Sequence, residues 1–373
     1  MKFGLHYLLS CADGQSPVQR YRDTLEQATR AEPLGFESVW PVEHHFHRAV
    51  SILPSPTMLL AAVAARTRTL RLGTAIVQLP LSHPLRIAEE LAMLDVLSDG
   101  RVECGVGRGG NGSHFAGFGV PMAESRDRMT EALEVVQRAW TEERVTFRGR
   151  FFEVDDVALA PRPVQQPHPP IHVAANSPDT AAWAGCAGLP LLAASNVNPF
   201  PKLRELLPHY RAARAAAGHR GDGDVTLLVP VYVGETRQRV ERDVAPSVRQ
   251  FARNAAAVAE PWVARAPEHE RPKLQAVLAQ IAAMSYTSVR ESTGIFDTPE
   301  GCVERLHWLR EELGPTRVIC WFNFGGLIPH ERVLRSMELF SSRVLSRFCA
   351  GRAARRGRLD CDAEHASDCP MAG

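Results

Sequence analysis

The chain has 373 residues, of which 45% are hydrophobic and 23% are charged, and its formal net charge at pH 7 is +1. This composition is typical of a globular protein and excludes a wholly disordered or collagen-like chain. The 43 basic and 42 acidic residues give no net positive field that would attract nucleic acid, and no run of about 18 apolar residues predicts a membrane span.

The N-terminus and the cysteines indicate the compartment. The first residues, MKFGLHYLLS, are followed by Cys11 and an acidic turn instead of a small-residue cleavage site. They therefore predict a first strand and not a signal peptide. The eight cysteines lie in apolar segments or in the C-terminal tail and form no disulfide-like framework. We expect a reducing compartment, the cytoplasm.

The first half of the chain alternates strand-like and helix-like segments. Residues 2–9 are strand-like, and residues 17–32 place Tyr21, Leu25 and Ala28 on one helical face. The alternation continues with a strand at 35–40, a helix at 56–66, a strand at 70–79, a helix at 84–97, a strand at 101–106 and a helix at 124–141.

The second half interrupts this pattern once and then resumes it. Residues 145–164 predict a β-hairpin insertion with a proline-rich exit. Strands follow at 171–175, 189–194, 226–233 and 317–324, with helices at 178–187, at 202–217, from 236 and at 331–348. Eight strands, each followed by a helix, predict a closed (β/α)8 TIM barrel with parallel strands. A Rossmann-like fold with further domains fits less well, because no change of composition divides the chain.

Two regions depart from the repeat. Residues 255–298 form a long, proline-punctuated insertion in the seventh unit, and loops of this length are typically lids or disordered segments. We predict a mobile lid there. Residues 349–373 lack apolar periodicity and predict a disordered tail, so that residues 1–348 form one barrel domain. Three residues of this tail, Cys361, His365 and Cys369, could bind a metal ion, but three ligands on a disordered tail are weak evidence for a metal site.

Residues 39–48, VWPVEHHFHR, place three histidines and a carboxylate directly after the second predicted strand. Histidine is a common metal ligand and also titrates near neutral pH. Active sites of (β/α)8 barrels lie where the strands end, so this cluster is expected at the barrel mouth. In an extended backbone neighbouring side chains alternate sides, so His44 would point away from His45 and His47. We therefore predict no metal site; His45 would shape the loop and His47 would be solvated.

Two further loops suggest anion binding. GVGRGG at residues 105–110 matches a dinucleotide-binding fingerprint, but that motif requires a helix immediately afterwards. The glycine-rich residues 111–120 do not predict one, so we reject that interpretation. A glycine loop carrying Arg108 could still approach a phosphate closely. Ser177 and Pro178 are typical of a helix start, and a helix N-terminus either binds an anion or simply begins a helix.

Several segments together resemble the bacterial luciferase-like family of flavin-dependent monooxygenases. They include GLHYLL, LGFESVWPVEHHF, SHPLRIAEE, SDGR, FGVPMAESR and the C-terminal VICWFNFGG, and the resemblance covers about residues 1–348. It implies a (β/α)8 barrel that binds reduced FMN (FMNH2), supplied by a separate flavin reductase. Oxygen would add at flavin C4a, and the resulting (hydro)peroxide would oxygenate a small organic substrate. A homodimer formed through the early helices is also implied.

The resemblance also implies roles for individual residues. His44 matches the catalytic histidine beside the flavin. Ala75 and Ile76 match a site, often a non-proline cis peptide, against which the flavin ring packs. Arg108 and Arg126 match the arginines that bind the FMN phosphate. Asn176, Ser177 and Thr180 match the phosphate loop and the helix terminus that follows it.

Departures from the light-emitting members, and relatives with other chemistry, limit the functional prediction. Gly107 replaces a reactive cysteine and Asn176 replaces an acidic residue, which argues against light production from aldehydes. The WFNFGG ending resembles members associated with natural-product tailoring. Residues 197–200, Trp262 and Trp321 imply a moderately apolar substrate pocket. F420-dependent hydride transfer and non-catalytic flavin binding remain alternatives.

Overall fold

The computed structural model describes residues 1–265, 268 and 271–348. Eight parallel strands close into a barrel, in which β10 pairs with β9 on one side and with β12 on the other. The barrel strands, in spatial order, are β1 (Lys2–Tyr7), β2 (Ser38–Pro41), β3 (Arg71–Gly73), β5 (Val102–Gly107), β8 (Ile171–Ala174), β9 (Leu191–Ala194), β10 (Val225–Val233) and β12 (Arg317–Trp321). The predicted (β/α)8 barrel is thus confirmed, and the predicted tail at 349–373 lies outside the described residues.

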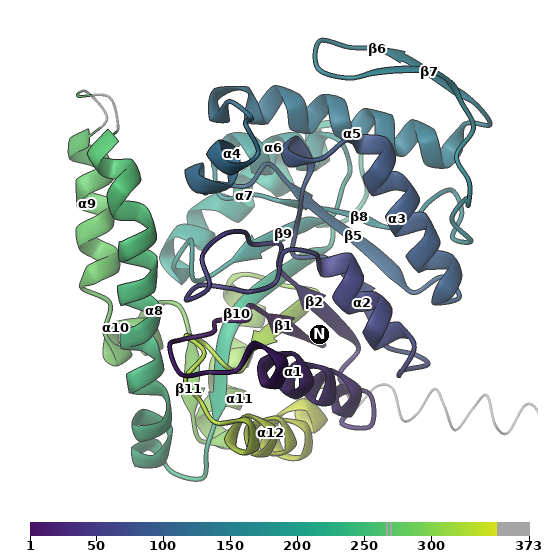
Figure 1. Cartoon of the computed structure of the whole chain (residues 1–373). Helices are drawn as coiled ribbons and strands as arrows, with labels where there is room; N and C mark the ends of the chain where they lie inside the picture. Colours follow the sequence, from purple (N-terminus) through teal and green to yellow (C-terminus); the bar gives the residue numbers. More distant parts are fainter. Residues whose placement is uncertain (266–267, 269–270, 349–373) are drawn as a thin grey trace, which may run out of the picture.

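Helices surround the barrel on its outside (Figure 1). They include α1 (Pro17–Ala31), α2 (Pro56–Ala64), α3 (Pro84–Leu97), α5 (Ser125–Thr141), α6 (Pro178–Cys186), α7 (Phe200–Ala216), α8 (Arg237–Arg265), α11 (Pro299–Glu312) and α12 (His330–Leu339). The last helix continues as a π-helical turn (Phe340–Val344) and a 3-10 turn (Leu345–Arg347). Among the described residues, no helix is both long and apolar enough to cross a membrane.

The predicted strand at 70–79 is broken in the structure. It divides into β3 and β4 (Val77–Gln78), followed by the 3-10 turn η1 (Leu79–Leu81), and the peptide bond between Ala75 and Ile76 is cis. At the break, the Thr74 hydroxyl donates to the Gly105 carbonyl over 2.7 Å and accepts the Gly105 N–H over 2.9 Å. A side chain therefore provides bonds that an unbroken strand would make through its backbone.

The glycine-rich segment after β5 contains a short helix that the sequence did not predict. Helix α4 (Gly112–Gly117) begins at Asn111, whose side chain accepts the Ser113 N–H. A 3-10 turn, η2 (Met122–Glu124), then leads into α5. Glycine has a low helix propensity, so the sequence did not predict this helix. The Asn111 cap stabilises it.

The predicted hairpin insertion is confirmed. Strands β6 (Val145–Arg148) and β7 (Glu153–Val157) pair antiparallel at the edge of the molecule. The Glu131 carboxylate of α5 accepts the N–H groups of Phe151 and Phe152 over 2.8 and 2.6 Å, which anchors the hairpin to the barrel helices.

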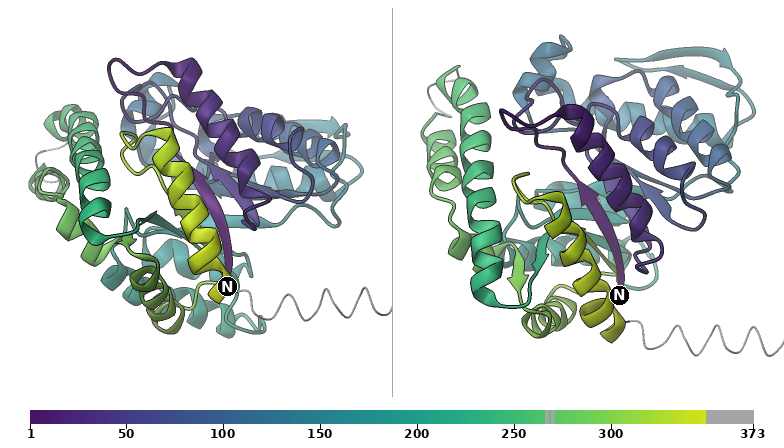
Figure 2. Two further views of the ribbon diagram at one scale, coloured as in Figure 1. Left: turned by 90° about the horizontal axis from the view of Figure 1, so that it is seen from below. Right: turned by 60° about the horizontal axis from the view of Figure 1, so that its bottom comes forward.

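The insertion in the seventh unit is present, but it is helical rather than a loop. Helix α8 continues to Arg265 through two internal prolines. Buried Val240, Val244 and Val248 recur at helical spacing along its first half, and Val263 is buried near its end. Helices α9 (Arg271–Ala282) and α10 (Tyr286–Ser292) and strand β11 (Ile295–Asp297), which pairs with β10, complete the insertion. Figures 1 and 2 show α8 and α9 side by side along one side of the barrel.

The barrel interior contains a buried ionic layer near the N-terminal ends of its strands. Arg317 donates two hydrogen bonds to the Glu103 carboxylate, of 2.6 and 2.9 Å, and His172 Nε2 lies 2.9 Å from the same group. Burial would raise the pKa of Glu103, but the hydrogen bond from His172 and the charge of Arg317 hold it well below its usual range. The Trp40 indole packs on this layer, with its ring 5.2 Å from the Arg317 guanidinium and 5.2 Å from the His172 ring. Gly73 leaves room for the indole, because a Cβ there would lie only 2.2 Å from it.

Candidate active site

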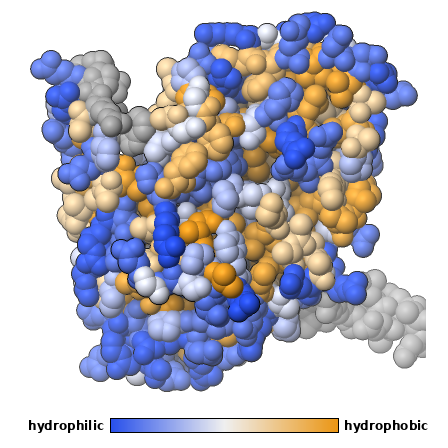
Figure 3. All heavy atoms as spheres, in the orientation of Figure 1, coloured by the Kyte–Doolittle hydropathy of each residue, from blue (hydrophilic) through white to orange (hydrophobic). Residues whose placement is uncertain are grey.

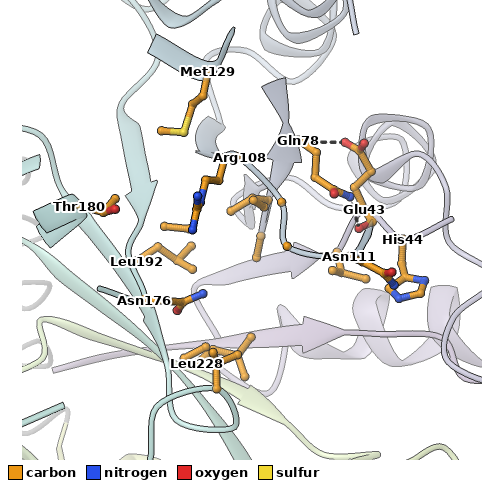
Figure 4. Close-up of a pocket in the computed structure, with 18 of the residues that line it drawn as sticks. Glu43, His44, Gln78, Arg108, Asn111, Met129, Asn176, Thr180, Leu192 and Leu228 are labelled. Atoms are coloured by element: carbon orange, nitrogen blue, oxygen red, sulfur yellow. Dashed lines mark hydrogen bonds between the residues drawn. The ribbon is translucent and has the colours of Figure 1, made fainter. Parts of the chain in front are cut away.

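A cavity of about 600 Å³ lies at the C-terminal ends of the barrel strands (Figure 4). Its wall combines residues of β1, β4, β8, β9, β10 and β12 with residues of the loops after β1, β2, β3, β5, β8 and β9 and of the helices that follow them. All eight residues predicted for the site line this cavity: His44, Ala75, Ile76, Arg108, Arg126, Asn176, Ser177 and Thr180. The structure therefore brings together side chains that are up to 136 positions apart in the sequence.

One wall is formed by the cis peptide and the strand beside it. Ala75 and Ile76 lie between β3 and β4 and face the cavity. A Cβ at Gly107 of the neighbouring strand would lie 2.3 Å from the Ile76 side chain and 3.3 Å from Ala174. The glycine thus permits the close approach of this wall, and a cysteine at this position would displace Ile76.

One end of the cavity is cationic. Arg108 follows β5 and Arg126 lies in the first turn of α5; within the described part of the chain, neither guanidinium has an ion pair or a hydrogen bond. Beside them, the Ser177 hydroxyl caps α6 by accepting the Thr180 N–H over 3.4 Å. A helix N-terminus carries partial positive charge and free N–H groups, so this end is suited to an anion.

The opposite end carries the histidine loop, which we define as residues 43–47. Figure 4 shows His44 across the cavity from Thr180 and Arg108. The predicted alternation of the histidines is wrong, because Phe46 has a φ of 66° and the chain turns there. Burial, together with the charges of His47 and His45, lowers the pKa of His44 to about 4. Its Nδ1 is buried, and no described group forms a hydrogen bond with it.

His114, on the short helix α4, fixes the histidine loop and was not predicted. Its Nε2 accepts the backbone N–H of His45 over 3.2 Å, so the proton lies on Nδ1, which donates to Gln78 Oε1 over 3.2 Å. The Gln78 side chain in turn donates to the backbone carbonyl of Glu43 over 2.9 Å. The His114 ring lies edge-on to that of His44, with 4.5 Å between centroids. The sequence offered one indication of this role: His114 follows strand β5 by seven positions, close to the end of the barrel where active sites lie.

The remaining side chains of the loop are also engaged. His45 Nε2 lies 3.0 Å from Glu43 Oε1, while the other oxygen of that carboxylate accepts the Gln78 backbone N–H. His47 was expected to be solvated, but its Nε2 forms a 2.6 Å hydrogen bond with the Ser113 hydroxyl. Over the described ranges, no group of three or more His, Cys, Asp or Glu side chains could hold a metal ion. The cysteines and histidine of the tail are outside those ranges.

The inner part of the cavity is largely apolar. Val197 and Trp321 line it, as the sequence suggested. Phe200 does not, because it is buried at the start of α7 with its ring 5.7 Å from that of Trp308. The Asn198 side chain donates to the Asn176 carbonyl and so supports the loop before α6. The side chain of Trp262 is not among those described.

Comparison with known proteins identifies the family. The sequence model of the luciferase-like monooxygenases matches residues 1–317. The chain belongs to this family. Within it, 4-hydroxyprotoasukamycin monooxygenase of Streptomyces nodosus subsp. asukaensis is 30% identical over 352 residues, which cover 90% of this chain and 89% of that protein. The oxygenase component of the flavin-dependent trigonelline monooxygenase of Acinetobacter baylyi is 26% identical over 375 residues, 95% of this chain and 98% of that one.

Solved structures share the fold of this chain. Monooxygenase RslO1 from Streptomyces bottropensis superposes with a TM-score of 0.79 at 31% identity, covering 93% of this chain and 100% of that one. The oxygenating constituent of 3,6-diketocamphane monooxygenase of Pseudomonas putida, in complex with FMN, gives a TM-score of 0.77 at 21% identity (92% and 97% covered). An F420-dependent secondary alcohol dehydrogenase gives 0.71 at 19% identity (92% and 98% covered), and at these two lower identities the likeness concerns the fold alone. As a luciferase-like family member, the chain is a flavin-dependent monooxygenase.

Proposed function

We propose that this chain is the oxygenase component of a two-component, FMN-dependent monooxygenase. It would take FMNH2 from a separate reductase and use O2 to give an oxygenated organic product, oxidised FMN and water. The observation that carries this proposal is the combination, at one end of a single cavity, of two unpaired arginines with the N-terminus of α6. That end offers about two positive charges and free N–H groups to a phosphate dianion.

The residues present fit FMN along the length of the cavity. Arg108 and Arg126 would bind the phosphate, supported by Ser177, Thr180 and the loop at Asn176. A Cβ at Gly110 would meet no atom within 4 Å, so the backbone there is open to a ligand. The wall at Ala75 and Ile76 would pack against the ring system, and bound reduced FMN would supply the electrons that activate O2.

His44 is the side chain that would handle protons. Its low pKa keeps the imidazole neutral at pH 7, and its buried Nδ1 is free to accept a proton or a hydrogen bond from a reacting group. The fixed ring of His114 against it would restrict its orientation. We assign His44 as the catalytic residue on this basis.

The insertion would exclude water from the cavity mouth. The Asn254 side chain of α8 donates to the Ala49 carbonyl in the loop after β2, over 2.6 Å. Phe251, one turn earlier, packs against Trp321 of the cavity with 5.7 Å between ring centroids. Helix α8 is thus attached to a loop and a side chain of the cavity mouth, and water exclusion protects reactive intermediates.

We also propose a homodimer formed through α2 and α3. Four large apolar side chains are exposed on these two helices, namely Met58, Met93, Val96 and Leu97, with Met58 at 76% exposure. A hydrogen bond between Thr57 and Glu90 brings the two helices together near this patch. Figure 3 shows apolar residues gathered on this side of the molecule. Exposed patches of this kind are typical of protein interfaces.

Anaerobic titration with FMNH2 and, in parallel, with reduced F420 tests the cofactor. We expect saturable binding of FMNH2, followed after admission of ¹⁸O2 and candidate substrates by a product that contains one ¹⁸O atom. Binding of F420 with reduction or oxidation of a substrate in the absence of oxygen would instead support the hydride-transfer alternative. Oxygen use that never yields a labelled product would support a non-catalytic flavin-binding protein.

A further inference from the structure

Four cavity-lining residues carry a buried polar atom without a partner in the described part of the chain; besides His44 Nδ1 and Asn196 Oδ1, two of these atoms lie on neighbouring barrel strands. They are Nδ1 of His6, at the end of β1, and Nε1 of Trp321, at the end of β12. The two residues are 3% and 2% exposed, and both line the cavity. Their rings meet edge to face, with centroids 5.4 Å apart.

Strand geometry directs both side chains to the inside of the barrel. Trp321 lies four positions after Arg317 on β12 and therefore shares its face, and Arg317 binds Glu103 in the interior layer. His6 lies on β1, two positions before Leu8, another cavity residue. The two rings, which contact each other, thus lie on the inside of the barrel, and we call this part of the cavity its floor.

The missing partners are unusual when compared with other buried tryptophans of the chain. Trp40 Nε1 donates to the Ser38 hydroxyl over 2.8 Å, and Trp140 Nε1 donates to the Ala88 carbonyl over 3.1 Å. Buried donors are almost always satisfied, so an unsatisfied one that lines a cavity points to a ligand. An indole N–H only donates, and its missing partner is therefore an acceptor.

The surroundings define the chemistry of that ligand. Burial lowers the pKa of His6 to about 3, against a smaller opposite effect of a hydrogen bond with the Trp40 backbone, so the ring is neutral at pH 7. The neighbouring floor residues include Leu8 and Leu228. The charged side chains of the cavity wall, Arg108, Arg126 and Glu43, lie in the cationic end and the histidine loop. A charged ligand group on the floor would therefore remain uncompensated.

We propose that His6 and Trp321 form a subsite that recognises an oxygen substituent, a hydroxyl or a carbonyl, on a neutral and largely apolar substrate. This inference rests on the proposed function and specifies its substrate class. Trp321 donates to the oxygen in either case. A hydroxyl can in addition donate to a deprotonated nitrogen of His6, which a carbonyl cannot do.

Three matched probes test the subsite: 1-tetralol, 1-tetralone and tetralin, which differ only in the oxygen substituent. Their binding is measured by titration calorimetry on the full chain, both with oxidised FMN bound and without it. We expect wild type to bind the two oxygenated probes about tenfold more tightly than tetralin. In Trp321→Phe this ratio should fall toward one, with the affinities for tetralin and FMN unchanged. His6→Leu should remove any preference for the alcohol over the ketone.

Trp140→Phe is the matched control, because it removes a satisfied indole N–H outside the cavity and should leave all ratios unchanged. The inference is overturned if wild type binds the three probes equally or not at all, or if the ratio survives in Trp321→Phe. It is also overturned if Trp321→Phe weakens FMN alone, since these groups would then serve the cofactor. Failure of FMN to bind would contradict the proposed function, while the ratios on the FMN-free chain would still decide the subsite.

Discussion

The arginines at the cationic end give the sharpest test of the cofactor assignment. Arg108→Met and Arg126→Met each remove one unpaired guanidinium and keep a side chain of similar length. A charge-assisted hydrogen bond contributes about 1.5–3 kcal/mol when it is sheltered, and both residues are exposed, so we use the lower end of that range. Each substitution should therefore raise the Kd for FMN about tenfold, and the double variant about a hundredfold if the two act independently.

Quenching of flavin fluorescence measures these constants, and riboflavin serves as the ligand control because it lacks the phosphate. Its affinity should be the same in all variants. Arg128→Met is the protein control, since Arg128 lies on the same helix but pairs with Glu124 over 2.8 Å and contacts the Phe151 ring. The reasoning is refuted if both single variants bind FMN like wild type, or if riboflavin affinity falls in parallel with FMN affinity.

Four further predictions concern other parts of the molecule. His44→Ala should bind FMN normally but yield no oxygenated product; wild-type turnover would exclude His44 from the chemistry. His114→Phe keeps a ring against His44 but loses the bonds that hold the histidine loop, so urea unfolding should show a loss of about 1–2 kcal/mol, together with lower product yield. Glu103→Gln should lower the free energy of unfolding at pH 7 by about 3 kcal/mol, because it leaves buried arginine charge unpaired. Since the folded pKa of Glu103 is depressed, its contribution is present above the unfolded pKa near 4.3 and is lost as the pH falls below it, so the difference from wild type should shrink in acid. Met58→Lys should convert dimer to monomer in light scattering, whereas Val18→Lys, at an exposed apolar site on α1, should not; a dimer in both would place the interface elsewhere.

The strand–helix order was predictable because its signals are local. Several helices begin where a serine or threonine cap precedes a proline, as at Ser16, Ser55, Ser177 and Thr298. A cap and a proline specify the start of a helix without reference to the rest of the chain. The position of His44 at the mouth follows from the same local order combined with the geometry of the barrel.

The errors share a different cause, which is contact between distant segments. The break after β3 depends on bonds between Thr74 and Gly105, 31 positions away. The engagement of His47 depends on Ser113, 66 positions away, on a helix that glycines conceal. In each case the periodicity of one segment carried no information about its partner.

Side chains at different positions along the barrel axis give the ionic layer and the cavity different chemistry. Side chains two positions apart on a strand occupy successive layers, so Arg317 and Trp321 belong to different levels of one face. The Trp40 indole packs against the Arg317 guanidinium, 5.2 Å from its ring centroid, and is not among the residues that line the cavity. Trp321 does line the cavity, where its Nε1 and the Nδ1 of His6 have no partner in the described part of the chain. In the proposed function, the anion would bind at the loops and helix terminus of one end, and the histidine loop at the other end would handle protons. A neutral substrate between them would meet the unpartnered atoms of His6 and Trp321, to which its own oxygen can bond.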